Sequence, residues 1–103
     1  MAKWEDVQRL VREFPDTEES TVYRNPAFKV HGKSLAWMSP HEQGALVTRA
    51  DPDEIPLMIA ANPKLYFTTS HYEGHPMVLT RLEVAGDDDL RERIEDSYDL
   101  LSG

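Results

Sequence analysis

The sequence contains no cysteine among its 103 residues. This absence excludes a disulfide-stapled scaffold, a thiol nucleophile and a zinc site built on cysteine ligands. No apolar run approaches the roughly 20 residues that a membrane-spanning helix requires, so no membrane partner is expected. The opening residues 1–6 carry no signal-peptide pattern, and the expected location is the cytoplasm.

Motifs that mark common enzyme classes are also missing. The five glycines are isolated, which excludes a glycine-rich phosphate loop, and no serine lies in a Gly-x-Ser-x-Gly turn. His71 and His75 have the spacing of a helical metal pair, but Gly74 and Pro76 prevent a helix there. We therefore expect no metal, no cofactor and no enzymatic activity. The alternative is an enzyme that uses His71.

Basic side chains are scarce, with 11 lysines and arginines against 19 aspartates and glutamates and a formal net charge of −8. Nucleic-acid-binding proteins usually have a basic surface, so this balance argues against strong binding to a polyanion. The acidity is uneven, however. Residues 1–23 carry three basic and six acidic side chains, residues 82–103 carry two and eight, and residues 24–81 carry six and five.

The central segment is therefore nearly neutral, and its cations can form a local patch. Alternate residues around a tight turn at Val30-His31-Gly32 would expose Lys29 and Lys33 on one face. The competing interpretation is that these lysines only protect a sheet edge from pairing with another chain. Composition alone favours this second interpretation. The nearly neutral central segment nevertheless allows a patch of Lys29, Lys33, Arg49 and Arg81 on one sheet face.

The remaining composition, 40% hydrophobic with nine aromatic side chains, is typical of one globular domain, here residues 1–103. The spacing of apolar residues and the turn signals predict an α+β fold of the order α-β(3)-α-β(2)-α, with helices packed on a mostly antiparallel sheet. The predicted elements are a helix over 4–14, an acidic loop at 16–20, a three-stranded meander within 27–48, a helix over 53–62, strands at 65–69 and 77–82, and a final helix that follows Gly86.

Two long segments resemble signatures of the MmcQ/YjbR family of small bacterial proteins. Residues 25–33, NPAFKVHGK, resemble the family pattern P-A-F-K-V-x-G-K, and residues 69–82, TSHYEGHPMVLTRL, resemble H-Y-x-G-x-P-x-V-L-V-R-L. Glu18-Glu19-Ser20 resembles the family's V-E-E-S/T loop, and the final acidic turn and helix lie where the family has D-x-D-E-L-x-x-L. The resemblance covers nearly the whole chain in order and spacing.

This resemblance implies the same α-β(3)-α-β(2)-α fold and the family's description as predicted DNA-binding proteins with two protruding hairpins, a double wing. The first wing would centre on His31-Gly32-Lys33 and the second on residues 71–75. The chain departs from the pattern at two places. Glu73 is acidic at the tip of the second wing, and His75 stands where an aromatic residue is common.

We therefore expect a non-enzymatic domain that binds DNA weakly and in a salt-sensitive way, as a monomer or a homodimer. The alternative is a protein- or small-molecule-binding module on the sheet face, lined by Trp37, Tyr66, Phe67 and Tyr72. The residues expected to contact DNA or another ligand are Lys29, His31, Lys33, Lys64, His71, Tyr72 and Arg81.

Overall fold

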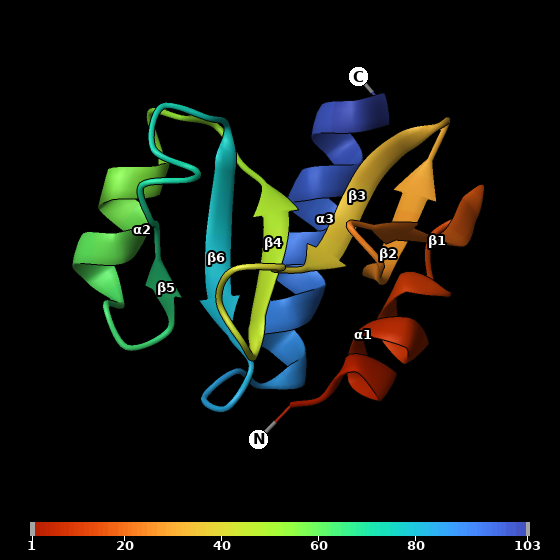
Figure 1. Ribbon diagram of the computed structural model, residues 1–103, viewed down its shortest axis with the longest axis horizontal. Coiled ribbons are helices and arrows are strands. Elements are labelled where there is room, and N and C mark those ends of the chain that lie inside the picture. Colours follow the sequence, from red (N-terminus) through yellow and green to blue (C-terminus); the bar gives the residue numbers. More distant parts are fainter. Residues whose placement is uncertain (1, 103) are drawn as a thin grey trace.

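The computed structural model describes residues 2–102, which form a six-stranded antiparallel sheet with helices on one of its faces (Figure 1). The α+β class and the antiparallel sheet are thus confirmed. The strand order across the sheet is β1-β2-β3-β4-β6-β5. The elements are α1 (Trp4–Val11), β1 (Thr17–Val22), β2 (Asn25–Val30), β3 (Lys33–Met38), β4 (Ala45–Arg49), α2 (Ile55–Ala61), β5 (Tyr66–Phe67), β6 (Met77–Arg81) and α3 (Asp87–Ser102).

The expected acidic loop at 16–20 is wrong, because residues 17–20 belong to strand β1. The order of elements is therefore α-β(4)-α-β(2)-α, with one strand more than the expected α-β(3)-α-β(2)-α. β1 pairs with β2 along its whole length, from Thr17 opposite Val30 to Val22 opposite Asn25. The two-residue turn between the strands is Tyr23-Arg24, and both residues have left-handed backbones, with φ of 48° and 68°. Such a turn matches the twist of a hairpin. As an edge strand β1 keeps its glutamates in water, and its sequence therefore lacks a strong apolar signal.

Other boundaries also differ from expectation. The helix predicted over 4–14 ends at Val11, because the backbone N–H groups of Glu13 and Phe14 bond to carbonyls only three residues earlier and tighten the chain into turns. The predicted strand over 65–69 is shorter, because the Thr69 carbonyl accepts the backbone N–H groups of Tyr72 and Glu73 and turns the chain out of the sheet. Helix α2 begins at Ile55 rather than at residue 53, because Asp51 holds the preceding residues in a turn. The Asp51 carboxylate accepts the backbone N–H of Asp53 at 2.9 Å, and its backbone carbonyl accepts that of Glu54. Within residues 2–102 no helix combines the length and the apolar character needed to cross a membrane.

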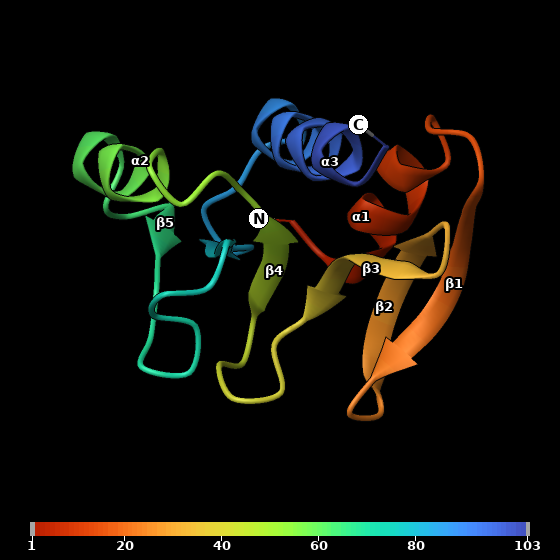
Figure 2. The same cartoon turned by 90° about the horizontal axis from the view of Figure 1, so that it is seen from above.

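Helices α1 and α3 lie side by side over one face of the sheet, and α2 sits beside edge strand β5 (Figure 2). Apolar residues at helical spacing are buried in both helices: Val7, Leu10 and Val11 in α1, and Leu90 and Ile94 in α3. They pack against alternate residues of the sheet, among them Phe28 and Leu46. Burial of this apolar surface is the main stabilising contribution to the fold.

Exposed ion pairs join α1 and the turn that follows it to α3. Arg91 donates two hydrogen bonds to the Glu13 carboxylate, at 2.9 and 3.1 Å, and Arg9 donates to Asp87 at 3.0 Å. The hydrogen bonds from Arg91 lower the pKa of Glu13 below its ordinary value. The backbone N–H of Lys3, followed by Arg9, lowers the pKa of Asp6 in the same direction. Many of the chain's acidic side chains therefore lie on the helix layer, where some of them form ion pairs with arginines.

Candidate nucleic-acid interface

The face of the sheet opposite α1 and α3, hereafter the helix-free face, has an apolar centre. The strand register places Ala27, Trp37, Val47 and Leu79 in one row across β2, β3, β4 and β6, and Phe67 continues it on β5. The first four side chains are at most 5% exposed. The row is thus a second core rather than an open ligand surface.

This burial corrects the expectation that Trp37 and Tyr66 line an open face. Trp37 is only 5% exposed. Tyr66 belongs to the core on the helix side, where the Arg93 guanidinium lies 5.5 Å from its ring and burial raises the pKa of its hydroxyl. Of the four predicted aromatic residues, Phe67 and Tyr72 remain partly exposed at the helix-free face.

Three connections project from the sheet on the helix-free side: the β1–β2 turn, the β3–β4 loop and the β5–β6 loop (Figure 2). The β3–β4 loop is held by Ser39, whose hydroxyl oxygen accepts the backbone N–H groups of His41 and Glu42 at 3.2 and 3.0 Å. The β5–β6 loop presents His71 to solvent and packs Tyr72 against the apolar row. The rings of His41 and His71 stack with centroids 3.7 Å apart, so the two loops touch each other.

Cations from three strands point to the helix-free face. Lys29, Arg49 and Arg81 alternate with residues of the apolar row on β2, β4 and β6. The Arg49 guanidinium lies 6.0 Å from the centroid of Trp37, and its Nε donates to the Ser34 carbonyl at 2.7 Å. Lys29 stands opposite Ser34 in the register and forms no ion pair within residues 2–102. Lys29 and Arg49 therefore lie near the same end of this face.

Lys33 does not join them, which corrects the expectation that both lysines share a face. Lys33 pairs with Val30, whose side chain is fully buried in the core under the helices. Partners across antiparallel strands point to the same side, so Lys33 leaves the hairpin on the helix side. His31 lies between them in an exposed turn with φ of 52°, followed by Gly32 with φ of 79°. The β2–β3 turn therefore splits the predicted lysine pair between two faces.

Arg81 and Lys64 form a separate group at the other end of the strands. Arg81 opposes Ala45, whereas Arg49 opposes Met77 at the far end of the same pairing. Nη1 of Arg81 donates to the Pro63 carbonyl at 3.2 Å, beside the exposed Lys64. The seven predicted contact residues thus do not form one site. Lys29 lies on the helix-free face, and His71 and Tyr72 lie in the β5–β6 loop beside that face.

The structure adds residues that the sequence reasoning missed. Tyr23 is 81% exposed at the tip of the β1–β2 turn, next to the exposed Arg24. The expectation of a loop at 16–20 leaves no strand before residue 25, and therefore no hairpin turn at Tyr23-Arg24. Asn25-Pro26 was the available signal for that turn, since Asn and Pro favour turns. His41 is a second addition, brought to His71 by loop packing alone.

Carboxylates also lie near this surface and limit its positive potential. Glu18 stands opposite Lys29 on the edge strand, and Glu42 and Glu73 occupy the two loops. Within residues 2–102 no group of three or more His, Asp or Glu side chains is placed to hold a metal ion. The arrangement offers charge, exposed aromatic rings and protruding loops, all of which can contact a ligand.

Comparison with known proteins supports the family resemblance that the sequence motifs indicate. Residues 12–100 match the family model YjbR. The chain is 33% identical over 115 residues to "Uncharacterized protein Rv2570" of Mycobacterium tuberculosis and to "Uncharacterized protein Mb2600" of Mycobacterium bovis, covering 95% of this chain and 87% of each relative. The crystal structure of Deinococcus radiodurans protein DR2400, with family-model domain DUF419, superposes with a TM-score of 0.80 at 22% identity, covering 99% of this chain and 80% of that one. The chain belongs to the YjbR family.

Proposed function

We propose that this chain is a non-enzymatic domain that binds duplex DNA weakly through its helix-free face. The β1–β2 turn and the β5–β6 loop are the two wings in this proposal, with the β3–β4 loop between them. Arg24, Lys29 and Arg49 contact phosphates, and Tyr23, His71 and Tyr72 contact sugars or bases at the wing tips.

The observation that carries the proposal is the separation of charge between the two sides of the molecule. The helix layer holds the acidic first turn of α3 and the paired arginines Arg9 and Arg91. On the helix-free side, Lys29 and Arg49 lie on the face itself and Arg24 lies in the β1–β2 turn. These three cations form no ion pair within residues 2–102. A polyanion approaching this molecule is repelled by one side and attracted by the other.

The binding is weak because few phosphates are neutralised. The phosphate contacts of Arg24, Lys29 and Arg49 release about three counterions, so the slope of log K against log salt concentration is about −2.7. Glu18, Glu42 and Glu73 reduce the affinity further. Fluorescence anisotropy with a short labelled duplex tests the proposal: binding at about 20 mM salt that disappears near physiological salt supports it, and no binding at low salt refutes it.

A further inference from the structure

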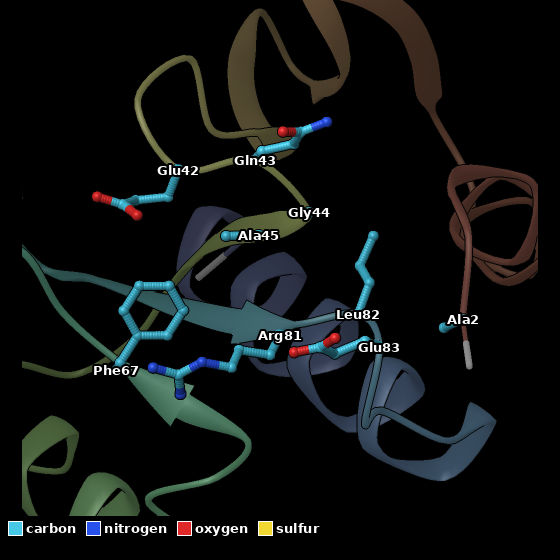
Figure 3. Close-up of a pocket in the computed structure, with 9 residues that line it drawn as sticks. All are labelled: Ala2, Glu42, Gln43, Gly44, Ala45, Phe67, Arg81, Leu82 and Glu83. Atoms are coloured by element: carbon cyan, nitrogen blue, oxygen red, sulfur yellow. The ribbon is translucent and has the colours of Figure 1, made fainter.

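A second candidate site lies at the end of the sheet away from Lys29. It is an open cavity of about 360 Å³ between the β3–β4 loop and the end of β6 (Figure 3). Glu42 and Gln43 approach it from the loop, while Phe67, Arg81 and Glu83 approach it from the opposite wall. Cavities of this size are at the lower end of the range that small-molecule sites occupy.

Contacts with the protein hold the Arg81 guanidinium in place, yet some of its N–H groups remain available for hydrogen bonds to a ligand. Its guanidinium carbon lies 4.1 Å from the centroid of the Phe67 ring, and Nη1 donates to the Pro63 carbonyl at 3.2 Å. Nε and Nη2 have no hydrogen-bond partner within residues 2–102. A guanidinium carries five N–H groups in a planar fork that matches a carboxylate in two-point contact. Arg81 is thus a pre-positioned receptor for an anionic group.

The loop wall is also pre-positioned. The Ser39 hydroxyl accepts the Glu42 backbone N–H at 3.0 Å, and the Glu42 carbonyl accepts the Ala45 N–H at 3.2 Å. The Gly44 carbonyl accepts the N–H of Leu82, which ties this wall to the chain that carries Glu83. A site whose walls are fixed before binding loses less free energy in ordering them.

The charges around the cavity do not neutralise each other. Glu42 and Glu83 both line it, yet neither lies within ion-pair distance of Arg81. One cation and two carboxylates therefore face a common space with an aromatic ring beside it. A ligand with one carboxylate and two ammonium groups has the complementary charges.

We propose that this cavity binds a cationic amino acid, a class that lysine and ornithine represent. The ligand carboxylate pairs with the fork of Arg81, and its two ammonium groups pair with Glu42 and Glu83. The aliphatic chain of the ligand packs along Phe67 and Leu82. This site is separate from the proposed DNA interface, since Arg24, Lys29 and Arg49 take no part in it.

The experiment is a titration of the ¹⁵N-labelled protein with three compounds that differ by one charged group each. L-lysine carries all three groups, L-norleucine lacks the side-chain ammonium, and cadaverine lacks the carboxylate. We expect lysine to shift the amide signals of Gly44, Phe67 and Arg81 and to bind at least about tenfold more tightly than either analogue, a difference of about 1.4 kcal/mol. Equal binding by the three compounds, or no shifts at tens of millimolar lysine, overturns the proposal.

Variants separate the roles of the three charges. Glu83→Gln and Glu42→Gln change exposed or half-exposed side chains and keep the fold, so loss of lysine binding by either reports on the site itself. Glu73→Gln is the matched control, because Glu73 lies in the β5–β6 loop outside this cavity. Unchanged lysine binding in both cavity variants contradicts the proposal. DNA binding by Glu83→Gln stays as in the parent protein, so failure of one proposal leaves the other testable.

Discussion

The rings of His41 and His71 lie parallel to within 6°, with their centroids 3.7 Å apart. They come from loops that are 30 positions apart along the chain and that otherwise project separately from the sheet. This stack is therefore a direct contact between the β3–β4 loop and the β5–β6 loop.

Loss of the stack should loosen the β5–β6 loop. A double-mutant cycle of His41→Ala and His71→Ala is expected to give a coupling free energy of about 0.5–1.5 kcal/mol in urea unfolding, the range of aromatic pairs. Amide exchange in residues 70–75 should become faster in either single variant. His75→Ala is the control, because His75 is exposed in the same loop and takes no part in the stack. A coupling free energy near zero would show that the stack is not stabilising.

Removing a carboxylate beside Lys29 should strengthen DNA binding. Glu18 lies opposite Lys29 in the register of β1 and β2, so both side chains point to the same face. Glu18→Gln is expected to raise the affinity for a short duplex by about two- to fivefold at low salt, and the increase should shrink as salt is added. Glu19→Gln is the matched control on the opposite face, where Gln8 donates to the Glu19 carboxylate. Equal increases in duplex affinity for the two variants would mean that only the net charge of the protein affects binding.

Acid should destabilise the protein partly through Glu13. The pKa of Glu13 is lowered in the folded state by Arg91, so this pair stabilises the fold above the ordinary glutamate pKa of about 4.3. The stabilisation is lost as the pH falls from about 4.3 through the lower folded-state value. Glu13→Gln should therefore lose less stability than the parent between pH 5 and pH 3. Glu95→Gln, which alters an exposed carboxylate without an ion pair in residues 2–102, should keep the parent's pH profile.

The β2–β3 turn should tolerate asparagine but not alanine at Gly32. Gly32 has φ of +79°, and a Cβ there would meet no atom within 4 Å, so only backbone strain opposes a substitution. Gly32→Ala should lower the free energy of unfolding by about 1–2 kcal/mol, while Gly32→Asn should cost less because asparagine adopts this conformation more readily. Thermal unfolding of the two variants measures the difference. An unchanged stability for alanine would contradict the left-handed turn.

The sequence was informative where one physical signal dominated. Apolar periodicity located both long helices, and His31-Gly32 located a hairpin turn, because burial and left-handed backbone each impose a residue type. Strand β1 was missed because an edge strand with exposed glutamates buries too little to show alternation. The family resemblance implied three strands before the second helix, one fewer than the structure has, because its Glu-Glu-Ser motif was assigned to a loop.

The candidate interface was harder to predict than the fold. The face of Lys29 follows from strand alternation, but Lys33 was placed wrongly because its direction depends on the register across the turn. A shift in the register between Phe28 and Lys29 makes the pairing of β2 with β3 irregular, and no local sequence pattern indicates this shift. The contact between His41 and His71, and the cavity at Arg81, arise from loops that meet only in three dimensions.

The central claim is that DNA binds to the helix-free face, and Lys29 and Lys33 test it within one hairpin. The two lysines carry the same charge, are four positions apart, and leave the sheet on opposite faces. The decisive measurement is the salt dependence of duplex affinity for Lys29→Gln and Lys33→Gln. The account predicts that Lys29→Gln lowers the slope by about 0.9 and that Lys33→Gln leaves it unchanged. Equal slopes for the two variants, or a larger change for Lys33→Gln, would contradict it.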